Sequence, residues 1–274
     1  MIIAAFFLGE IEMTEENSIL TRRQIMAFIA VAGGISAVAP LRAQLNMGKI
    51  GKVGGAAKDL QDSESLSDAE LKGYFDQIAA DSDRQNPLAS PKDKYGKRIA
   101  ALSRGMQNHD GLNLDIKAYL VSDVNAFAMA NGTIRIFAGL MDKFTDDEIR
   151  YVIGHEIGHV KKGHTKKRMQ AALRGSALTK AAGAAGGTVG KIASSDLTKF
   201  FGKVVSAQHS QANEKEADDY ALAFMKTKKF APMACVTALD KLAAMGGGGG
   251  GPKWLSTHPS PEERSKRMRA QLAA

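Results

Sequence analysis

The chain of 274 residues contains one cysteine, Cys235. A single cysteine cannot form an internal disulfide, so a fold held together by disulfides is excluded, and so is a zinc site built on cysteine thiolates. The composition, 44% apolar and 24% charged, is that of an ordinary globular protein that can bury a core of its own.

The sequence also lacks a long hydrophobic run. Its longest apolar stretch, Ile25 to Ala39, is shorter than the roughly 20 residues that a membrane-spanning helix needs, and Gly33 and Gly34 interrupt it. A basic pair precedes this stretch and the small residue Ala43 follows it. We therefore predict that residues 1–43 are a signal peptide cleaved after Ala43, and that the protein is exported to the periplasm; a permanent membrane anchor is the alternative.

Two details of this signal stay open. Arg22 and Arg23 after Thr21 resemble the twin-arginine export signal, whereas the residues that follow also fit a general secretory signal with two arginines at its basic end. Translation from Met13 would give a signal of more usual length.

The excess of positive charge, formally +8, is spread along the chain and is densest in "KKGHTKKR", residues 161–168. No aromatic residue interleaves with these lysines, so bases would have nothing to stack on, and we expect no nucleic-acid partner. A solvated helix face is the favoured interpretation; peripheral association with an anionic membrane is the alternative.

Local patterns predict a mainly helical chain with one small sheet. After a glycine-rich linker over residues 44–60, "LSDAELKGYFDQIAADSD" has apolar residues at helical spacing behind Ser67, and a second helix is expected within 92–106. Residues 114–140 are typical of strands, with a hairpin turn at Asn131-Gly132, and they predict a two- or three-stranded sheet. Further helices are expected over about 206–228 and 232–245, and six glycines at 246–251 then form a flexible connection. No internal repeat is present.

Residues 175–205 are rich in alanine and glycine. They are typical of helices that pack closely through small side chains; a mobile helical hairpin near a membrane is the alternative.

The motif "HEIGH" stands on a predicted helix, because Thr145 to Glu148 forms a capping box directly before it. His155 and His159 are four residues apart, which places both imidazoles on one helix face within reach of one ion. Glu156 is turned about 100° away, where it can act as a general base on a metal-bound water. This spacing predicts a zinc hydrolase site.

Two glycines flank the histidines. Each glycine within a helix costs about 1 kcal/mol relative to alanine, so Gly154 and Gly158 indicate that another element passes close to this face. His164 falls about 140° from His159 on one continuous helix, and we expect it to be structural or exposed rather than a ligand.

A catalytic zinc needs a third protein ligand. "NEKEADDYA" offers Glu214, with Glu216 and His209 as alternatives. Asp218, one turn after Glu214, is expected to hold the free N–H of a ligand histidine, with His155 as the expected partner. Ala217 and Ala221 keep this helix face thin.

These motifs resemble those of the zinc peptidases that include the HtpX and CAAX prenyl proteases, most closely the soluble periplasmic branch of LoiP (YggG) and BepA type. "NAFAMANGTIRIFAGLMD", "VIGHEIGHV", "EKEADDY" and "THPSPEER" occur in the family's order over about residues 65–270. One position departs from the lipid-anchored members, since Gln44 stands where they have a cysteine.

The resemblance implies an α+β, mainly helical zincin-type fold over residues 61–274, with one zinc bound by two histidines and a glutamate. It implies endopeptidase activity on unfolded or misassembled envelope proteins. It also suggests that Asn125 and Ala126 belong to an edge strand that pairs with substrate backbone. His258, in a loop expected over the active site, is a possible regulatory ligand, and Arg264 a possible oxyanion stabiliser.

Two rival functions remain at this point. A chaperone or assembly factor on the same fold would hold unfolded chains without cutting them, and a basic protein would bind a membrane surface. An intact "HEIGH" favours the enzyme, because binding alone does not require Glu156.

Overall fold

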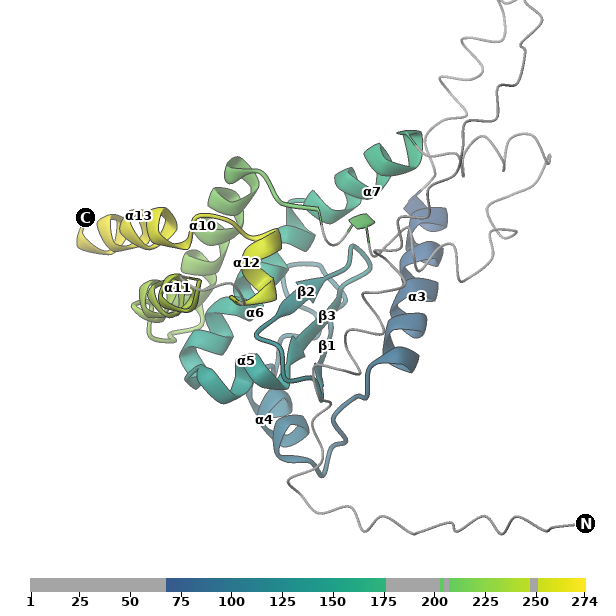
Figure 1. Ribbon diagram of the computed structural model, residues 1–274, viewed down its shortest axis with the longest axis horizontal. Coiled ribbons are helices and arrows are strands. Elements are labelled where there is room, and N and C mark those ends of the chain that lie inside the picture. Colours follow the sequence, from purple (N-terminus) through teal and green to yellow (C-terminus); the bar gives the residue numbers. More distant parts are fainter. Residues whose placement is uncertain (1–67, 176–202, 205–206, 247–250) are drawn as a thin grey trace, which may run out of the picture.

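The computed structural model describes residues 68–175, 203–204, 207–246 and 251–274 (Figure 1). The predicted signal peptide and linker, the cap Ser67 and most of the alanine- and glycine-rich stretch lie outside the described residues. The described part is mainly helical with one small sheet, as predicted.

The sheet has three strands in the order β1-β3-β2, with bounds Asp115–Tyr119, Ala126–Ala128 and Thr133–Phe137 for β1, β2 and β3. The predicted hairpin joins β2 to β3 antiparallel, and Gly132 takes the positive φ of 91° that its turn requires. β1 pairs with β3 in parallel, which local sequence patterns did not predict. The expectation of strand up to residue 140 is wrong at its end, because helix α5, Ala138–Lys143, begins directly after β3.

Most helices pack on one side of the sheet (Figure 1). The predicted capping box is present at Thr145 and starts α6, Asp146–Lys161, which lies against α10, Gln211–Thr227. α11, Ala234–Met245, packs on α6 and on the C-terminal helix α13, Pro261–Ala273. The short helix α12, Lys253–Thr257, precedes α13, and α4, Lys94–Leu102, packs on β1. Buried apolar side chains of these elements form the main core.

α3, Asp68–Gln85, lies on the other side of the sheet (Figure 1). Its predicted apolar face is buried against the β2–β3 turn and α7, His164–Gly175. Because side chains alternate along a strand, Ile134 and Ile136 enter the main core while Arg135 faces α3. The buried Arg135 guanidinium is paired with Asp83 of α3 at 2.8 Å and with Asp115 of β1 at 2.9 Å.

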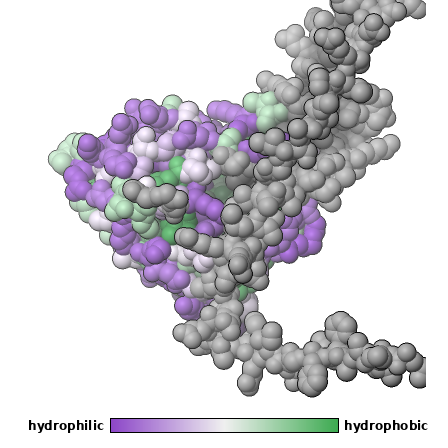
Figure 2. Space-filling model, in the orientation of Figure 1, coloured by the Kyte–Doolittle hydropathy of each residue, from purple (hydrophilic) through white to green (hydrophobic). Residues whose placement is uncertain are grey.

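The visible face of the described residues is mostly hydrophilic, with apolar side chains in small separate areas (Figure 2). Within the described part, Met233 is the exposed large apolar side chain, at 49% exposure. No helix in that part is both long and apolar enough to cross a membrane.

Candidate metal centre and active site

Helix α6 carries the predicted motif through the middle of the molecule. His155, Glu156 and His159 are all buried, with at most 2% of their surface exposed. The Nε2 atoms of the two histidines lie 3.0 Å apart, so both rings point to one place. The spacing of four residues therefore brings both imidazoles to one point, as predicted.

The two glycines of α6 let α10 approach closely. A Cβ atom on Gly158 would lie 3.0 Å from the Cα atom and the carbonyl oxygen of Ala217, and one on Gly154 would lie 3.4 Å from the Cα atom of Ala221. The prediction that another element passes close to this face is confirmed. The close approach brings the carboxylates of α10 beside the histidines of α6.

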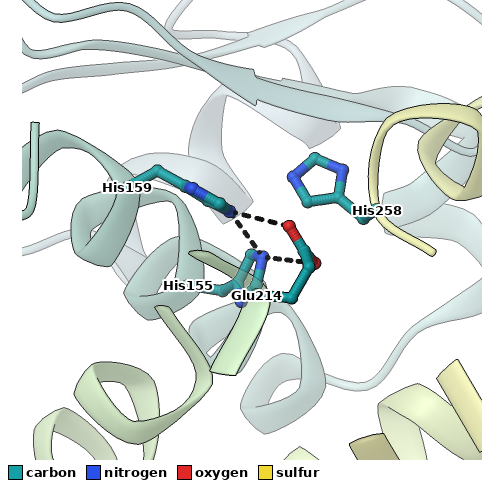
Figure 3. Close-up of side chains that lie close together, drawn as sticks. All are labelled: His155, His159, Glu214 and His258. Carbon is teal, nitrogen blue, oxygen red and sulfur yellow. Dashed lines mark hydrogen bonds and ion pairs between the residues drawn. The ribbon is translucent and has the colours of Figure 1, made fainter. Parts of the chain in front are cut away.

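Glu214 is the α10 residue that faces both histidines (Figure 3). Its Oε1 lies 3.4 Å from His159 Nε2, and its Oε2 lies 3.5 Å from His155 Nε2. The side chain is 1% exposed, so this carboxylate has no access to bulk water. Figure 3 shows the three side chains converging from two helices.

The loop after α12 adds a fourth side chain, His258, to this group (Figure 3). One ligand atom from each of His155, His159, Glu214 and His258 can be chosen so that all lie within 4.8 Å of one another. The sequence-predicted ligands and the possible regulatory ligand thus meet at one buried point.

The atoms at this point fit a metal ion. Neither oxygen of Glu214 accepts a hydrogen bond, although Arg264 Nη1 lies 2.5 Å from Oε2, and His258 Nε2 also has no hydrogen-bond partner. Buried polar atoms without partners are costly, and a cation among them would satisfy them. Imidazole and carboxylate donors suit zinc and related first-row metals.

Asp218 lies on the outer side of the site, beside His155. Its Oδ1 lies 3.0 Å from His155 Nδ1 and accepts a hydrogen bond of 2.8 Å from the Tyr151 hydroxyl. A carboxylate at Nδ1 fixes the tautomer of His155 with its Nε2 lone pair directed at the cluster.

The Arg264 guanidinium binds Asp218 through two hydrogen bonds of 2.7 and 2.8 Å and also lies against Glu214. Arg264 is 4% exposed and thus supplies the buried positive charge that balances these two carboxylates. Its predicted role as an oxyanion stabiliser would need the guanidinium to turn away from them, and that role stays a prediction.

Burial and neighbouring charges shift the pKa values of these groups. Burial raises the pKa of Glu214 to about 8 and of Glu156 to about 7, against the opposing effect of Arg264 on both. Burial and Arg264 lower the pKa of His155 to about 4, which favours the neutral, metal-binding ring. Burial opposes ionisation of Asp218, but Arg264 and His155 outweigh it and hold its pKa well below the usual range.

Glu156 does not point at the two α6 histidines. Its Oε1 accepts a hydrogen bond of 3.3 Å from the indole Nε1 of Trp254 and lies 3.6 Å from His258 Nε2. The Glu156 carboxylate therefore lies beside the four ligand side chains and is not one of them, which is the position that a general base requires.

The alternatives for the third ligand lie elsewhere. Glu216 points outward, with its side chain 55% exposed, and pairs with His164 at 3.0 Å. The His209 ring is close to that of His159, at 3.9 Å between centroids, but it is not part of the four-residue group.

His164 is buried and structural. The expectation of one continuous helix was wrong, because α6 ends at Lys161 and Gly163, at φ 67°, turns the chain into α7. From the start of α7, His164 Nδ1 reaches back to His159 Nδ1 at 2.9 Å.

Ala126 begins the edge strand β2, which lies at the end of the order β1-β3-β2, and Asn125 directly precedes it. The Asn125 carbonyl accepts a hydrogen bond from Phe137 N, so this residue still pairs with β3. Ala126, next along, directs its N–H and C=O away from β3.

Sequence reasoning did not single out two residues of the site. Tyr151 precedes His155 by one helical turn, so its contact with Asp218 follows from the α6 face that was already predicted. Trp254 is the only tryptophan of the chain and is fully buried, and no local pattern placed it on Glu156.

Two helix-borne histidines, a carboxylate from a second helix and a buried carboxylate beside them define a metallopeptidase site on a mainly helical fold with a small sheet. Residues 96–272 match the model of Peptidase family M48, and the chain belongs to this family, which confirms the resemblance noted from its motifs. It is a metalloendopeptidase, and its fold is of the zincin type.

Relatives of the chain are also named as proteases. The chain is 39% identical to metalloprotease LoiP of Escherichia coli over 84% of this chain and 90% of that one. It is 36% identical to metalloprotease YcaL of the same organism, over 77% and 83%. A beta-barrel assembly-enhancing protease of Yersinia pestis is 28% identical over 88% of this chain and 51% of its own length.

Proposed function

We propose that this protein is an exported, zinc-dependent endopeptidase that hydrolyses cell-envelope proteins, with Glu156 as its general base. The observation that carries the proposal is the buried convergence of four ligand side chains, of which Glu214 and His258 direct atoms without hydrogen bonds into the group, with the Glu156 carboxylate beside it. His155, His159 and Glu214 would hold one zinc ion, with Asp218 orienting His155.

When bound, the metal supplies Lewis-acid polarisation of the peptide carbonyl and makes a water molecule acidic near neutral pH. Glu156 accepts the proton of the attacking water and passes it to the leaving amine as the C–N bond breaks. The buried setting of this carboxylate makes it a stronger base than an exposed glutamate. The Asn125 and Ala126 edge would align the substrate backbone as an added strand.

His258 would take the remaining metal position when its loop is closed, and the enzyme would then be latent. The proximity of its unpartnered Nε2 to the ligand group supports this assignment. We expect His258→Ala to raise turnover of an unfolded substrate with zinc still bound. Unchanged turnover and unchanged zinc would contradict both ligation and gating, and a large loss would give His258 a direct part in catalysis.

Envelope substrates and a quality-control role are supported by the relatives and by the predicted signal peptide of residues 1–43. One relative is named for enhancing β-barrel assembly, and such proteins are built in the envelope. Cleavage of unfolded or misassembled envelope proteins in the periplasm, with peripheral membrane association, is the role we propose. Holding such chains without cutting them is the alternative role.

The test is metal analysis of the purified protein together with casein digestion with and without a chelator. We expect about one zinc per chain and digestion that stops with the chelator and returns with added zinc. Metal-free protein that digests casein, or zinc-loaded protein that does not, would contradict the proposal. The second result combined with suppression of casein aggregation would favour the holding role.

A further inference from the structure

Trp254 contacts three groups at the place where a substrate of the proposed peptidase would bind. The indole Nε1 donates to Glu156 Oε1 at 3.3 Å. The indole ring stacks on the His258 imidazole, with centroids 4.3 Å apart and an angle of 5° between the planes. The backbone N–H of Trp254 donates to the carbonyl of Val124, next to the β2 edge, at 3.4 Å.

The contact with Val124 lies where a substrate strand would pair. Phe137 N donates to the Asn125 carbonyl and Met129 N to the Thr133 carbonyl, so residues 125, 127 and 129 bond to β3. In an antiparallel pair the residues between them direct their backbone groups to the open side. The Trp254 N–H thus takes a carbonyl just before Ala126, as the first amide of an added strand would. The outward N–H of Ala126 donates to the Asn125 side-chain carbonyl at 3.0 Å, and the Ala128 carbonyl accepts from the Thr165 hydroxyl at 3.4 Å, so an added strand would displace these bonds as well.

Trp254 and His258 belong to one hydrogen-bonded turn. The Trp254 carbonyl accepts a hydrogen bond of 2.9 Å from His258 N and lies 3.2 Å from His258 Nδ1. A proton on Nδ1 leaves the lone pair on Nε2, the atom directed at the ligand group. The Arg264 guanidinium lies 5.1 Å from the indole ring. A displacement of this turn therefore moves the indole away from Glu156 together with the imidazole.

We propose that Trp254 is a positioning residue that couples occupation of the β2 edge to release of Glu156 and His258. A peptide strand that pairs along the edge takes the Val124 carbonyl from the Trp254 N–H, and the turn then lifts. One motion frees the general base and the ligand group. This inference rests on the proposed edge binding and latency.

The fluorescence of Trp254, the sole tryptophan of the chain, reports on opening of the turn, because this side chain is fully buried while the turn is closed. The experiment measures acrylamide quenching of its fluorescence in the zinc-loaded full chain, recorded by stopped flow before the added peptide is turned over. The probe is a tryptophan-free extended peptide, and its control is the same peptide with N-methylated backbone amides, which cannot add as a strand. Anisotropy of a labelled copy reports binding separately.

We expect the normal peptide to increase quenching several-fold and to shift emission to longer wavelength, and the N-methylated peptide to do neither. His258→Ala should increase quenching without peptide. A peptide that binds while Trp254 stays shielded, equal effects of the two peptides, or no binding at all would overturn the proposal. Chelator-sensitive casein digestion by the zinc-loaded chain is scored separately, so loss of the coupling and loss of the proposed function are distinguishable.

A second variant tests the coupling by kinetics. Trp254→Phe keeps an aromatic ring beside His258 but lacks the N–H that binds Glu156. If the turn is a latch, the open fraction rises, so KM should fall several-fold. The loss of the bond to Glu156 is read separately, in kcat. Ser256→Ala, at an exposed position of the same helix, is the control and should change neither. An unchanged or raised KM in the folded Trp254→Phe variant would overturn the proposal.

Discussion

At the scale of single residues, the ligand assignment depends on which α10 carboxylate faces α6. Glu214 and Glu216 are two residues apart, yet one is 1% exposed and faces both histidines while the other is 55% exposed and faces His164. Two positions on a helix differ by about 200° in direction, which is why only one can reach the histidines.

We therefore expect Glu214→Ala to lose most of its bound zinc and Asp218→Ala to bind it about 10- to 100-fold more weakly. Glu216→Ala is the matched comparison and should weaken zinc binding far less than Glu214→Ala does, because Glu216 reaches His159 only through His164. Zinc affinity is measured by competition with a chromophoric chelator. An empty site in the Glu216 variant, with normal affinity in the Glu214 variant, would reverse the assignment.

Much at this scale could be predicted from sequence, because helical spacing alone aligns His155 with His159 and Glu214 with Asp218. The contact of Trp254 with Glu156 spans 98 residues. The engagement of Arg264 with both carboxylates likewise depends on how α13 packs. No local pattern contains such information.

At the scale of elements, the centre depends on how closely α6 and α10 approach. Gly158 and Ala217 meet at the crossing, and the nearest atoms to an added Cβ belong to the α10 backbone, which cannot move aside as a flexible side chain can. The glycines and small residues predicted a close neighbour, but the sequence did not identify α10 as that neighbour.

Gly158→Ala should consequently push α10 away and lower zinc affinity several-fold, even though alanine favours a helix by about 1 kcal/mol. Gly73→Ala in α3 is the control, because a Cβ there meets nothing within 4 Å. That variant should gain stability and keep its zinc affinity. Zinc titration and thermal unfolding of both variants check this, and unchanged affinity in the Gly158 variant would show that α10 adapts at no cost to the site.

At the scale of the whole molecule, α3 precedes the matched family region of residues 96–272 but packs on the same sheet. Its apolar face was predicted from periodicity. The position of α3 on the sheet was not predicted, because the contact that fixes it joins Arg135 of the central strand to Asp83 of α3, 52 residues away. That buried ion pair and the apolar contacts make α3 part of the fold.

Phe75, 1% exposed in the α3 contact, tests this. Phe75→Ala should lower the free energy of unfolding by about 3–5 kcal/mol, the usual cost of a large core deletion. Gln77→Ala, exposed on the same helix, should stay within about 0.5 kcal/mol of the parent. Urea denaturation measures both, and equal stabilities of the two variants would mean that α3 contributes little to the fold.

Glu156→Gln separates hydrolysis from metal binding, because it changes only the general base of the proposed metal-dependent peptidase. The substitution keeps size and hydrogen bonding but removes the proton acceptor. Zinc content and peptide turnover are measured on the parent and the variant under the same conditions. We expect equal zinc content in the two proteins and a loss of turnover of several orders of magnitude in the variant. Equal turnover with equal zinc would contradict the assignment of Glu156 as the general base.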